Sequence, residues 1–264
     1  MSNYKDWIDA IDLKVDYFSA FMKAWIAFNA WYESGEITVT GKRDRDYIES
    51  IANNTNRFKT YIIRLLSGDD SESKTYRDSV ANLHGALLNA PITTQAYIGI
   101  RQAVSFSEVA IKNTNSSKKK DYYSHHYECI RSNGKIKTIV STKATGRVCF
   151  AFEEEYNVEV LRTQADFKTL SQTQQEKCLE CYKELRPYII ESVLYTQDNP
   201  QEDPLVMGSY SFVNDKNVVS RAIVLILYLL RCCLAHGDIS PDELTNKVYR
   251  YAYEVLLAPL KKLK

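Results

Sequence analysis

The 264-residue chain is long enough for one large domain or two small ones, and its contents of 45% hydrophobic and 25% charged residues are ordinary for a globular protein. Its net charge of +1 excludes an overall basic field, so any nucleic-acid site must come from a local patch. The first residues, MSNYKDWIDAIDLK, do not resemble a signal peptide, and the longest apolar run, Ala222 to Leu230, is far shorter than the ~20 residues that span a bilayer. We therefore expect a cytoplasmic protein without a membrane segment.

The first predicted element is a long helix, because polar and apolar residues alternate with helical spacing and Gly35 follows as a stop signal. Residues at spacings of three and four place one stripe on a single face, comprising Ile11, Val15, Phe18, Met22, Trp25, Asn29 and Tyr32. Asn29 stands where the stripe requires an apolar side chain, and a buried amide without hydrogen bonds costs on the order of 1–3 kcal/mol. Asn29 is therefore either a satisfied core amide that fixes helix register or a polar contributor to a site.

Further helices are predicted over roughly 46–66 and 76–88, after a loop or short extended piece at 36–46. A solvated linker, NTNSSKKKD, follows at 113–121. Its three lysines are either ordinary solvated residues or an RNA-binding patch that contacts phosphates, namely Lys118, Lys119 and Lys120.

Between about 122 and 160 the sequence becomes rich in Tyr, Ile, Val and Phe. The Asn133-Gly134 step between two strand-like runs is a strong hairpin signal, because a type I′ turn needs positive φ at both central residues. We predict a two- or three-stranded antiparallel piece here. The expected fold is mainly α, one domain over 1–264 in which a helical bundle carries this small β-hairpin or sheet as an insertion.

Helices are predicted to resume at about 166–196, and a final pair at about 215–236 and 241–258. Six cysteines are expected to be free thiols in a cytoplasmic protein. Cys178 and Cys181 have CxxC spacing, but no second pair completes a zinc site and the surrounding pattern is helical. Neither a metal nor a cofactor is expected, and the common nucleotide-binding and hydrolase motifs are absent from the sequence.

The penultimate predicted helix, NDKNVVSRAIVLILYLLRCCLAHG, is apolar all round in its middle, which indicates burial on every side. The apolar run breaks at Arg231, and His236 follows five residues later. Gly237 can end the helix in a left-handed conformation, and Ser240-Pro241-Asp242-Glu243 fits an N-cap, a first-turn proline and a reaching Glu for the next helix. Arg231 and His236 are therefore expected in the last turn of a core helix.

These two residue types can together cleave RNA. An imidazole that titrates near neutral pH can move the proton when a ribose 2′-hydroxyl attacks its own phosphodiester. A guanidinium is permanently charged and matches phosphate oxygens in a bidentate way, so it can hold the anionic transition state. RNA brings its own nucleophile in this reaction, so no metal is required and a 2′,3′-cyclic phosphate is left.

Helical geometry complicates this pairing. Five residues along an ideal helix turn about 500°, so Arg231 and His236 point roughly 140° apart. Either the last turn loosens before Gly237, or two copies of the helix meet and each supplies part of the site.

The stretch RCCLAHG at the end of an apolar helix resembles the R-x4-6-H motif of the HEPN superfamily of ribonucleases. The segment FMKAWIAFNAWY (21–32) is similar to the aromatic-rich first helix of prokaryotic HEPN proteins. The resemblance implies a homodimer with one composite, metal-independent site, in which Arg231 binds phosphate and His236 is the general acid and base. Asn29 becomes a supporting polar residue. Cys232 departs from the family pattern, which often has Asn, Asp or His after the arginine.

The leading hypothesis is a homodimeric endoribonuclease that cuts single-stranded RNA in anti-phage defence or as a toxin, with an antitoxin or defence-system protein as a further partner. A second hypothesis is a non-catalytic HEPN-like module that binds RNA or protein through the hairpin. A third is a structural subunit of a larger complex. In a purely structural reading, His236 only complements the negative end of its helix.

Overall fold

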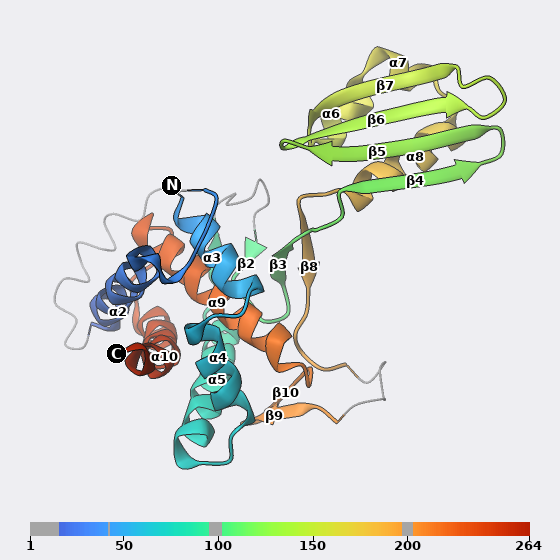
Figure 1. Cartoon of the computed structure of the whole chain (residues 1–264). Coiled ribbons are helices and arrows are strands. Elements are labelled where there is room, and N and C mark those ends of the chain that lie inside the picture. Colours follow the sequence, from blue (N-terminus) through green and yellow to red (C-terminus); the bar gives the residue numbers. More distant parts are fainter. Residues whose placement is uncertain (1–15, 42, 95–101, 197–202) are drawn as a thin grey trace. The chain divides into compact units, whose positions relative to one another are not determined.

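The computed structural model describes residues 16–41, 43–94, 102–196 and 203–264. The chain forms two compact units (Figure 1). The helical unit comprises Met1–Ala110 and Ile190–Lys264, and the sheet unit comprises Ile111–Ile189.

Strand β3 (Val109–Lys112) pairs with β8 (Tyr188–Glu191), and these two strands contain the points at which the chain passes between the units. The sequence predicts one domain over 1–264 with a β-rich insertion at about 122–160. The inserted unit is longer than this on both sides, because it also includes strands before residue 122 and, at its other end, helices that complete a core of its own.

The prediction of a mainly α, HEPN-like helical bundle with a small β insertion was wrong. Of the described residues, 53% are helical and 21% lie in strands, so the fold is mixed. The physical reason is that the segment expected to form a solvated linker and a hairpin instead forms a four-stranded antiparallel sheet. Further two-stranded sheets add to the strand content.

In the helical unit, six helices form the described framework: α2 (Tyr17–Trp31), α3 (Asp44–Asn53), α4 (Arg57–Ser67), α5 (Ser71–Asn89), α9 (Lys216–Ala235) and α10 (Glu243–Leu260). Short elements join them: a π-helical turn (Tyr32–Glu36), a 3-10 turn (Lys261–Leu263), the pair β1 (Thr93–Thr94) and β2 (Gln102–Ala103), and the pair β9 (Leu205–Met207) and β10 (Tyr210–Phe212).

Several predicted helix boundaries differ from the structure for local reasons. The start of the first predicted helix, with Ile11 and Val15, lies outside the described residues, and its end is marked by Gly35 with φ 97°. The helix predicted over 46–66 divides into α3 and α4, because the Asn56 side chain accepts the Lys59 backbone N–H at 2.9 Å and starts a new helix. The helix predicted over 166–196 ends at Glu184 and gives way to β8.

Helix α9 is the core of the helical unit, and its predicted bounds are confirmed. Aromatic residues of α2 and α10 pack together, with Phe21 and Tyr249 ring centroids 5.3 Å apart, and the Tyr249 hydroxyl donates to the Leu230 carbonyl at 2.7 Å. Among the described helices, α9 is long and apolar enough to cross a membrane by length and composition. Because 67% of its most apolar window is buried within the protein, it is consistent with the core helix of a soluble protein.

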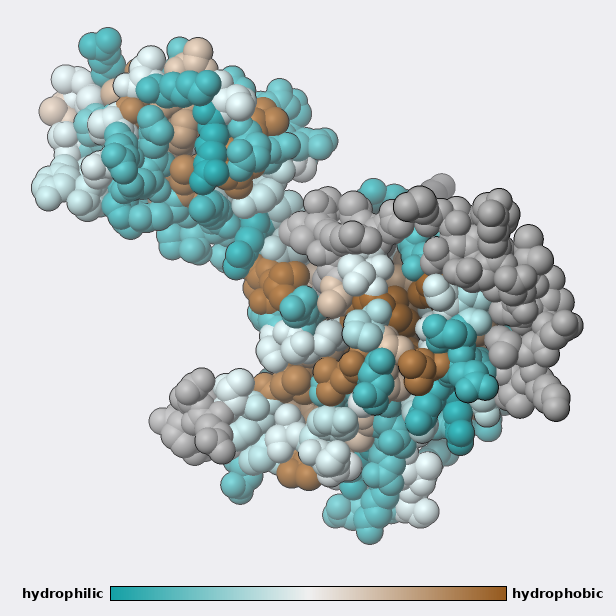
Figure 2. All heavy atoms as spheres, turned by 180° about the vertical axis from the view of Figure 1, so that it is seen from behind, coloured by the Kyte–Doolittle hydropathy of each residue, from teal (hydrophilic) through white to brown (hydrophobic). Residues whose placement is uncertain are grey.

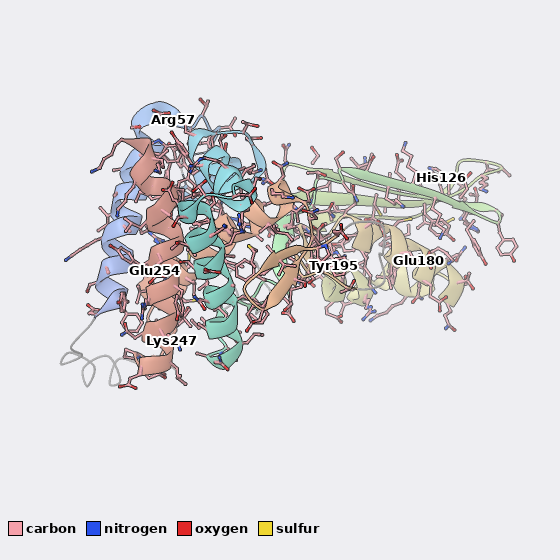
Figure 3. All side chains as sticks on the ribbon, turned by 90° about the horizontal axis from the view of Figure 1, so that it is seen from below. Arg57, His126, Glu180, Tyr195, Lys247 and Glu254 are labelled. Atoms are coloured by element: carbon pink, nitrogen blue, oxygen red, sulfur yellow. The ribbon has the colours of Figure 1, made fainter. Side chains whose placement is uncertain are left out.

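In the sheet unit, four antiparallel strands run in chain order: β4 (Ser117–Tyr122), β5 (His125–Ser132), β6 (Lys135–Thr142) and β7 (Val148–Glu155). Three helices cover one face of the sheet (Figures 1 and 3): α6 (Val158–Thr163), α7 (Ala165–Thr169) and α8 (Gln172–Glu184). Asn133 and Gly134 have φ of 52° and 80°, and Ser132 pairs with Lys135. The predicted two-residue turn is therefore confirmed.

Alternating residues of the sheet point into a core shared with the helices, while hydrophilic side chains dominate the visible surface of this unit (Figure 2). The core includes Tyr127, Cys129, Val140, Phe150, Cys178, Cys181 and Tyr182. All six cysteines of the chain are free thiols. Within the described ranges, no cluster of three or more His, Cys, Asp or Glu side chains has a geometry that could hold a metal ion.

The buried histidine of the helical unit predicts a pH-dependent stability. His84 is 2% exposed, its ring packs edge-on against Tyr210 with centroids 4.5 Å apart, and burial lowers its pKa. The unfolded chain therefore takes up this proton at higher pH than the folded protein. The contribution of the neutral His84 ring to the free energy of unfolding is fully present above the unfolded pKa of about 6.5. This contribution is lost as the pH falls below that value.

Urea unfolding between pH 8 and 5 measures this effect. We expect His84→Phe to flatten the pH dependence of the free energy of unfolding. His126→Gln, at a histidine whose side chain is 36% exposed, controls for the loss of one imidazole. Equal slopes for wild type and His84→Phe would contradict the prediction.

Candidate functional site

The last turn of α9 is a regular helix that ends in a Schellman motif. The His236 backbone N–H donates to the Cys232 carbonyl at 3.0 Å, which is the α-helical spacing. Gly237 then turns left-handed with φ 66°, and its N–H donates to the Leu234 carbonyl at 3.2 Å. The N–H of Asp238 reaches back to the Cys233 carbonyl at 2.9 Å. The predicted role of Gly237 is confirmed, because a side chain at this φ would be strained.

The next helix begins differently from the sequence prediction. Asp242, not Ser240, is the N-cap of α10, and its carboxylate accepts the Thr245 backbone N–H at 2.7 Å. A carboxylate both caps the free N–H groups and interacts favourably with the positive end of the helix, which a hydroxyl does less well.

Arg231 forms an ion pair with Asp44, the first residue of α3. Its Nη1 lies 3.4 Å from Asp44 Oδ2, and the two side chains are 30% and 26% exposed. Arg231 Nε and Asp44 Oδ2 are both buried and make no hydrogen bond to a described residue, so the contact between the two side chains is ionic. Burial opposes the charge of Arg231, but the Asp44 carboxylate and the Cys232 thiol outweigh it and raise the pKa of the guanidinium.

Tyr32 and Asn29 form a chain of hydrogen bonds that ends at the second carboxylate oxygen of Asp44. The Tyr32 hydroxyl donates to Asp44 Oδ1, and the Asn29 amide donates to the Tyr32 oxygen at 2.6 Å and to Glu33 at 3.3 Å. Burial raises the pKa of Tyr32, and its hydrogen bond to Asp44 raises it further, so the hydroxyl stays protonated and can donate. The structure thus links Asn29 to Arg231 through two intermediate side chains, from α2 and its π-helical end to α3 and α9.

His236 is the C-cap of α9 and its side chain is exposed. Among the described residues, nothing forms a hydrogen bond or ion pair with its imidazole. Because α9 stays α-helical to its end, Arg231 and His236 diverge by roughly 140° about the helix axis. The loosened last turn, one of the two expected solutions, is not observed, and one copy of the chain does not direct both side chains at one atom.

The three predicted RNA-binding lysines lie in the sheet unit, on β4 rather than in a solvated linker. Each has a carboxylate partner: Lys118 pairs with Glu184 at 4.0 Å, Lys119 with Glu128 at 2.5 Å, and Lys120 with Glu180 at 2.6 Å. Glu180 lies on the helical side of this unit (Figure 3). These partners offset the charge of the lysines, and an RNA-binding role for them stays a prediction.

Two residues of the network were missed by the sequence analysis. Tyr32 belongs to the predicted apolar stripe, so the sequence indicates a core residue, and Asp44 falls in a predicted loop. Asp44 and Arg231 are far apart in sequence, so no local pattern connects them. The only local signal is that an acidic residue is favoured in the first turn of a helix.

No protein-family model, curated protein or solved structure matches this chain.

Tyr32→Phe tests the network. Removing the hydroxyl deprives the Asp44 carboxylate of a donor and the Asn29 amide of one of its two acceptors, so we expect a loss of about 1–3 kcal/mol in the free energy of unfolding. Tyr47→Phe is the matched control, because the Tyr47 ring stacks on Tyr32 with centroids 5.3 Å apart. Its hydroxyl forms no hydrogen bond within the described part of the chain. Equal losses for the two variants, measured by urea unfolding, would contradict the prediction.

Proposed function

We propose that this protein is a HEPN-type, metal-independent endoribonuclease that cleaves single-stranded RNA and works as a homodimer. The observation that carries the proposal is the end of α9, where a half-buried arginine held by a carboxylate precedes an exposed histidine on a rigid helix cap. RCCLAHG supplies the resemblance to HEPN ribonucleases. The proposal concerns this site and its chemistry, not the fold of the whole chain.

The chemistry follows from the two side chains. The neutral His236 imidazole accepts the proton of a ribose 2′-hydroxyl, and the 2′-oxygen attacks the adjacent phosphorus. The bond to the 5′-oxygen breaks, and an imidazolium returns a proton to this leaving group, so a 2′,3′-cyclic phosphate and a 5′-hydroxyl result. Arg231 neutralises the phosphate oxygens as negative charge builds up on them.

A second copy of the chain completes the site in this proposal. The regular last turn of α9 keeps Arg231 and His236 apart within one copy, whereas a two-fold axis places Arg231 of each copy near His236 of the other. The composite site of such a dimer contains two equivalent Arg231–His236 pairs, each formed by residues of both copies.

The biological setting belongs to the same proposal. We place the protein in the cytoplasm, where RNA is its substrate, and assign it to anti-phage defence or toxicity, with an antitoxin or defence-system protein as a regulatory partner. Lys118, Lys119 and Lys120 would contribute to RNA binding only where phosphates displace their glutamate partners.

The proposed reaction is tested with labelled single-stranded RNA in EDTA. We expect wild type to cut and to leave 2′,3′-cyclic phosphate ends, and His236→Ala and Arg231→Ala to lose at least about a hundredfold in rate, as for loss of a general base. A 2′-O-methyl RNA of the same sequence should stay intact, because it has no nucleophile.

His126→Ala and Arg250→Ala are the matched controls, since the first lies on the sheet and the second pairs with Glu254 on the surface of α10. Intact RNA with wild-type protein would end the nuclease proposal, as would equal cutting by the Arg231 and His236 variants.

Mixing two inactive variants tests the composite site. When equal amounts of Arg231→Ala and His236→Ala proteins exchange subunits, half of the dimers are mixed, and each mixed dimer contains one of its two Arg231–His236 pairs with both native residues. We therefore expect about a quarter of the wild-type rate. Each variant alone, taken through the same exchange, is the control. Persistent inactivity of a mixture shown to contain mixed dimers would mean that both residues act from the same copy.

A further inference from the structure

The further inference concerns Asp44 and rests on the proposed function of Arg231. Asp44 begins α3, where the positive end of the helix favours a carboxylate. Its Oδ1 accepts the Tyr32 hydroxyl, and its buried Oδ2 lies against Arg231 Nη1. Each carboxylate oxygen therefore has a fixed direction, one toward α2 and one toward α9.

The guanidinium has an inner and an outer side. Nε is buried without a hydrogen-bond acceptor among the described residues, and Nη1 contacts the Asp44 carboxylate, although the side chain as a whole is 30% exposed. Nε is thus closed to a substrate. A phosphate that binds the guanidinium must therefore do so through an Nη nitrogen.

The hydrogen bonds from Asn29 to Tyr32 and from Tyr32 to Asp44 restrict the movement of the Asp44 carboxylate. Tyr32 is fully buried, and Asn29 donates to the Tyr32 oxygen at 2.6 Å, so the hydroxyl that binds Asp44 is itself held. A carboxylate fixed in this way cannot follow the guanidinium outward. It contacts the guanidinium at Nη1, while 30% of the Arg231 side chain stays exposed.

We propose that Asp44 is a positioning residue, which fixes the Arg231 guanidinium so that its Nη edge meets an RNA phosphodiester. Asp44 itself does not touch the substrate. Tyr32 and Asn29 hold Asp44 in place. A guanidinium oriented before the substrate arrives needs no rearrangement as negative charge develops, which is the condition under which electrostatic stabilisation is most effective.

A different role for Asp44 leads to the opposite result and so makes the proposal testable. If the carboxylate competed with phosphate for Arg231, removing its charge would speed cleavage. If it positions Arg231, removing its charge slows cleavage with little change in KM, because the loss falls on the transition state.

The experiment compares kcat and KM of Asp44→Asn, Asp44→Glu and wild type on single-stranded RNA. We expect Asp44→Asn to lower kcat at least tenfold, and Asp44→Glu to recover part of the loss because it keeps the charge. Asp46→Asn is the matched control, since Asp46 also lies in the first turn of α3 but pairs with the exposed Arg43 at 3.5 Å. An unchanged or raised kcat in Asp44→Asn overturns the proposal.

A second measurement separates this proposal from the nuclease proposal. In ¹H–¹⁵N spectra the Arg231 Nε–H signal should exchange slowly with water in wild type and in Asp46→Asn. Asp44→Asn should speed that exchange at least tenfold while the backbone amide spectrum is retained. Should wild type cut no RNA, the nuclease proposal fails but this spectrum still tests whether Asp44 fixes Arg231. Equal exchange in wild type and Asp44→Asn shows that Asp44 does not fix Arg231.

Discussion

The burial of α9 on every side is the constraint on which the helical unit depends. Each fully buried Leu, Ile or Val is worth about 1.5–3 kcal/mol, and seven of the 20 residues of this helix are buried Leu, Ile or Val. A helix of this kind needs neighbours all round, and α2, α3, α4 and α10 provide them. A polar side chain on α9 must then find a partner or reach the surface. The apolar run therefore ends at Arg231, which forms an ion pair with Asp44 and is partly exposed to solvent.

Arg231 shows how the core constrains the site. A guanidinium that is largely withdrawn from water needs a compensating charge, and Asp44 supplies it from the start of α3. The carboxylate in turn needs donors for its other oxygen, which brings in Tyr32 and, behind it, Asn29. A requirement for neutrality and hydrogen bonding thus links Arg231 to three further side chains, and the proposed phosphate binding by Arg231 rests on this arrangement.

In the sheet unit the charged side chains lie outside the core. The core lies between one face of the sheet and the helices, and charged residues on the surface form ion pairs with each other. The Lys118–Lys120 run illustrates this: one lysine pairs across the sheet with Glu128 and two pair with glutamates of α8. In the sequence these lysines form a basic patch, whereas in the folded unit each lies beside a glutamate.

Local patterns in the sequence determined the bounds of α9, the left-handed Gly237, the Asn133-Gly134 turn and the polar position of Asn29 in the apolar stripe, because each depends on neighbours within a few positions. Only the tertiary structure decided that the chain forms two units and a four-stranded sheet, since strand pairing joins segments whose patterns look alike whether they pair or not. The contact between Asp44 and Arg231 also depends on the tertiary structure. The two residues are far apart in the sequence, and only the packing of α3 against α9 brings their charges together.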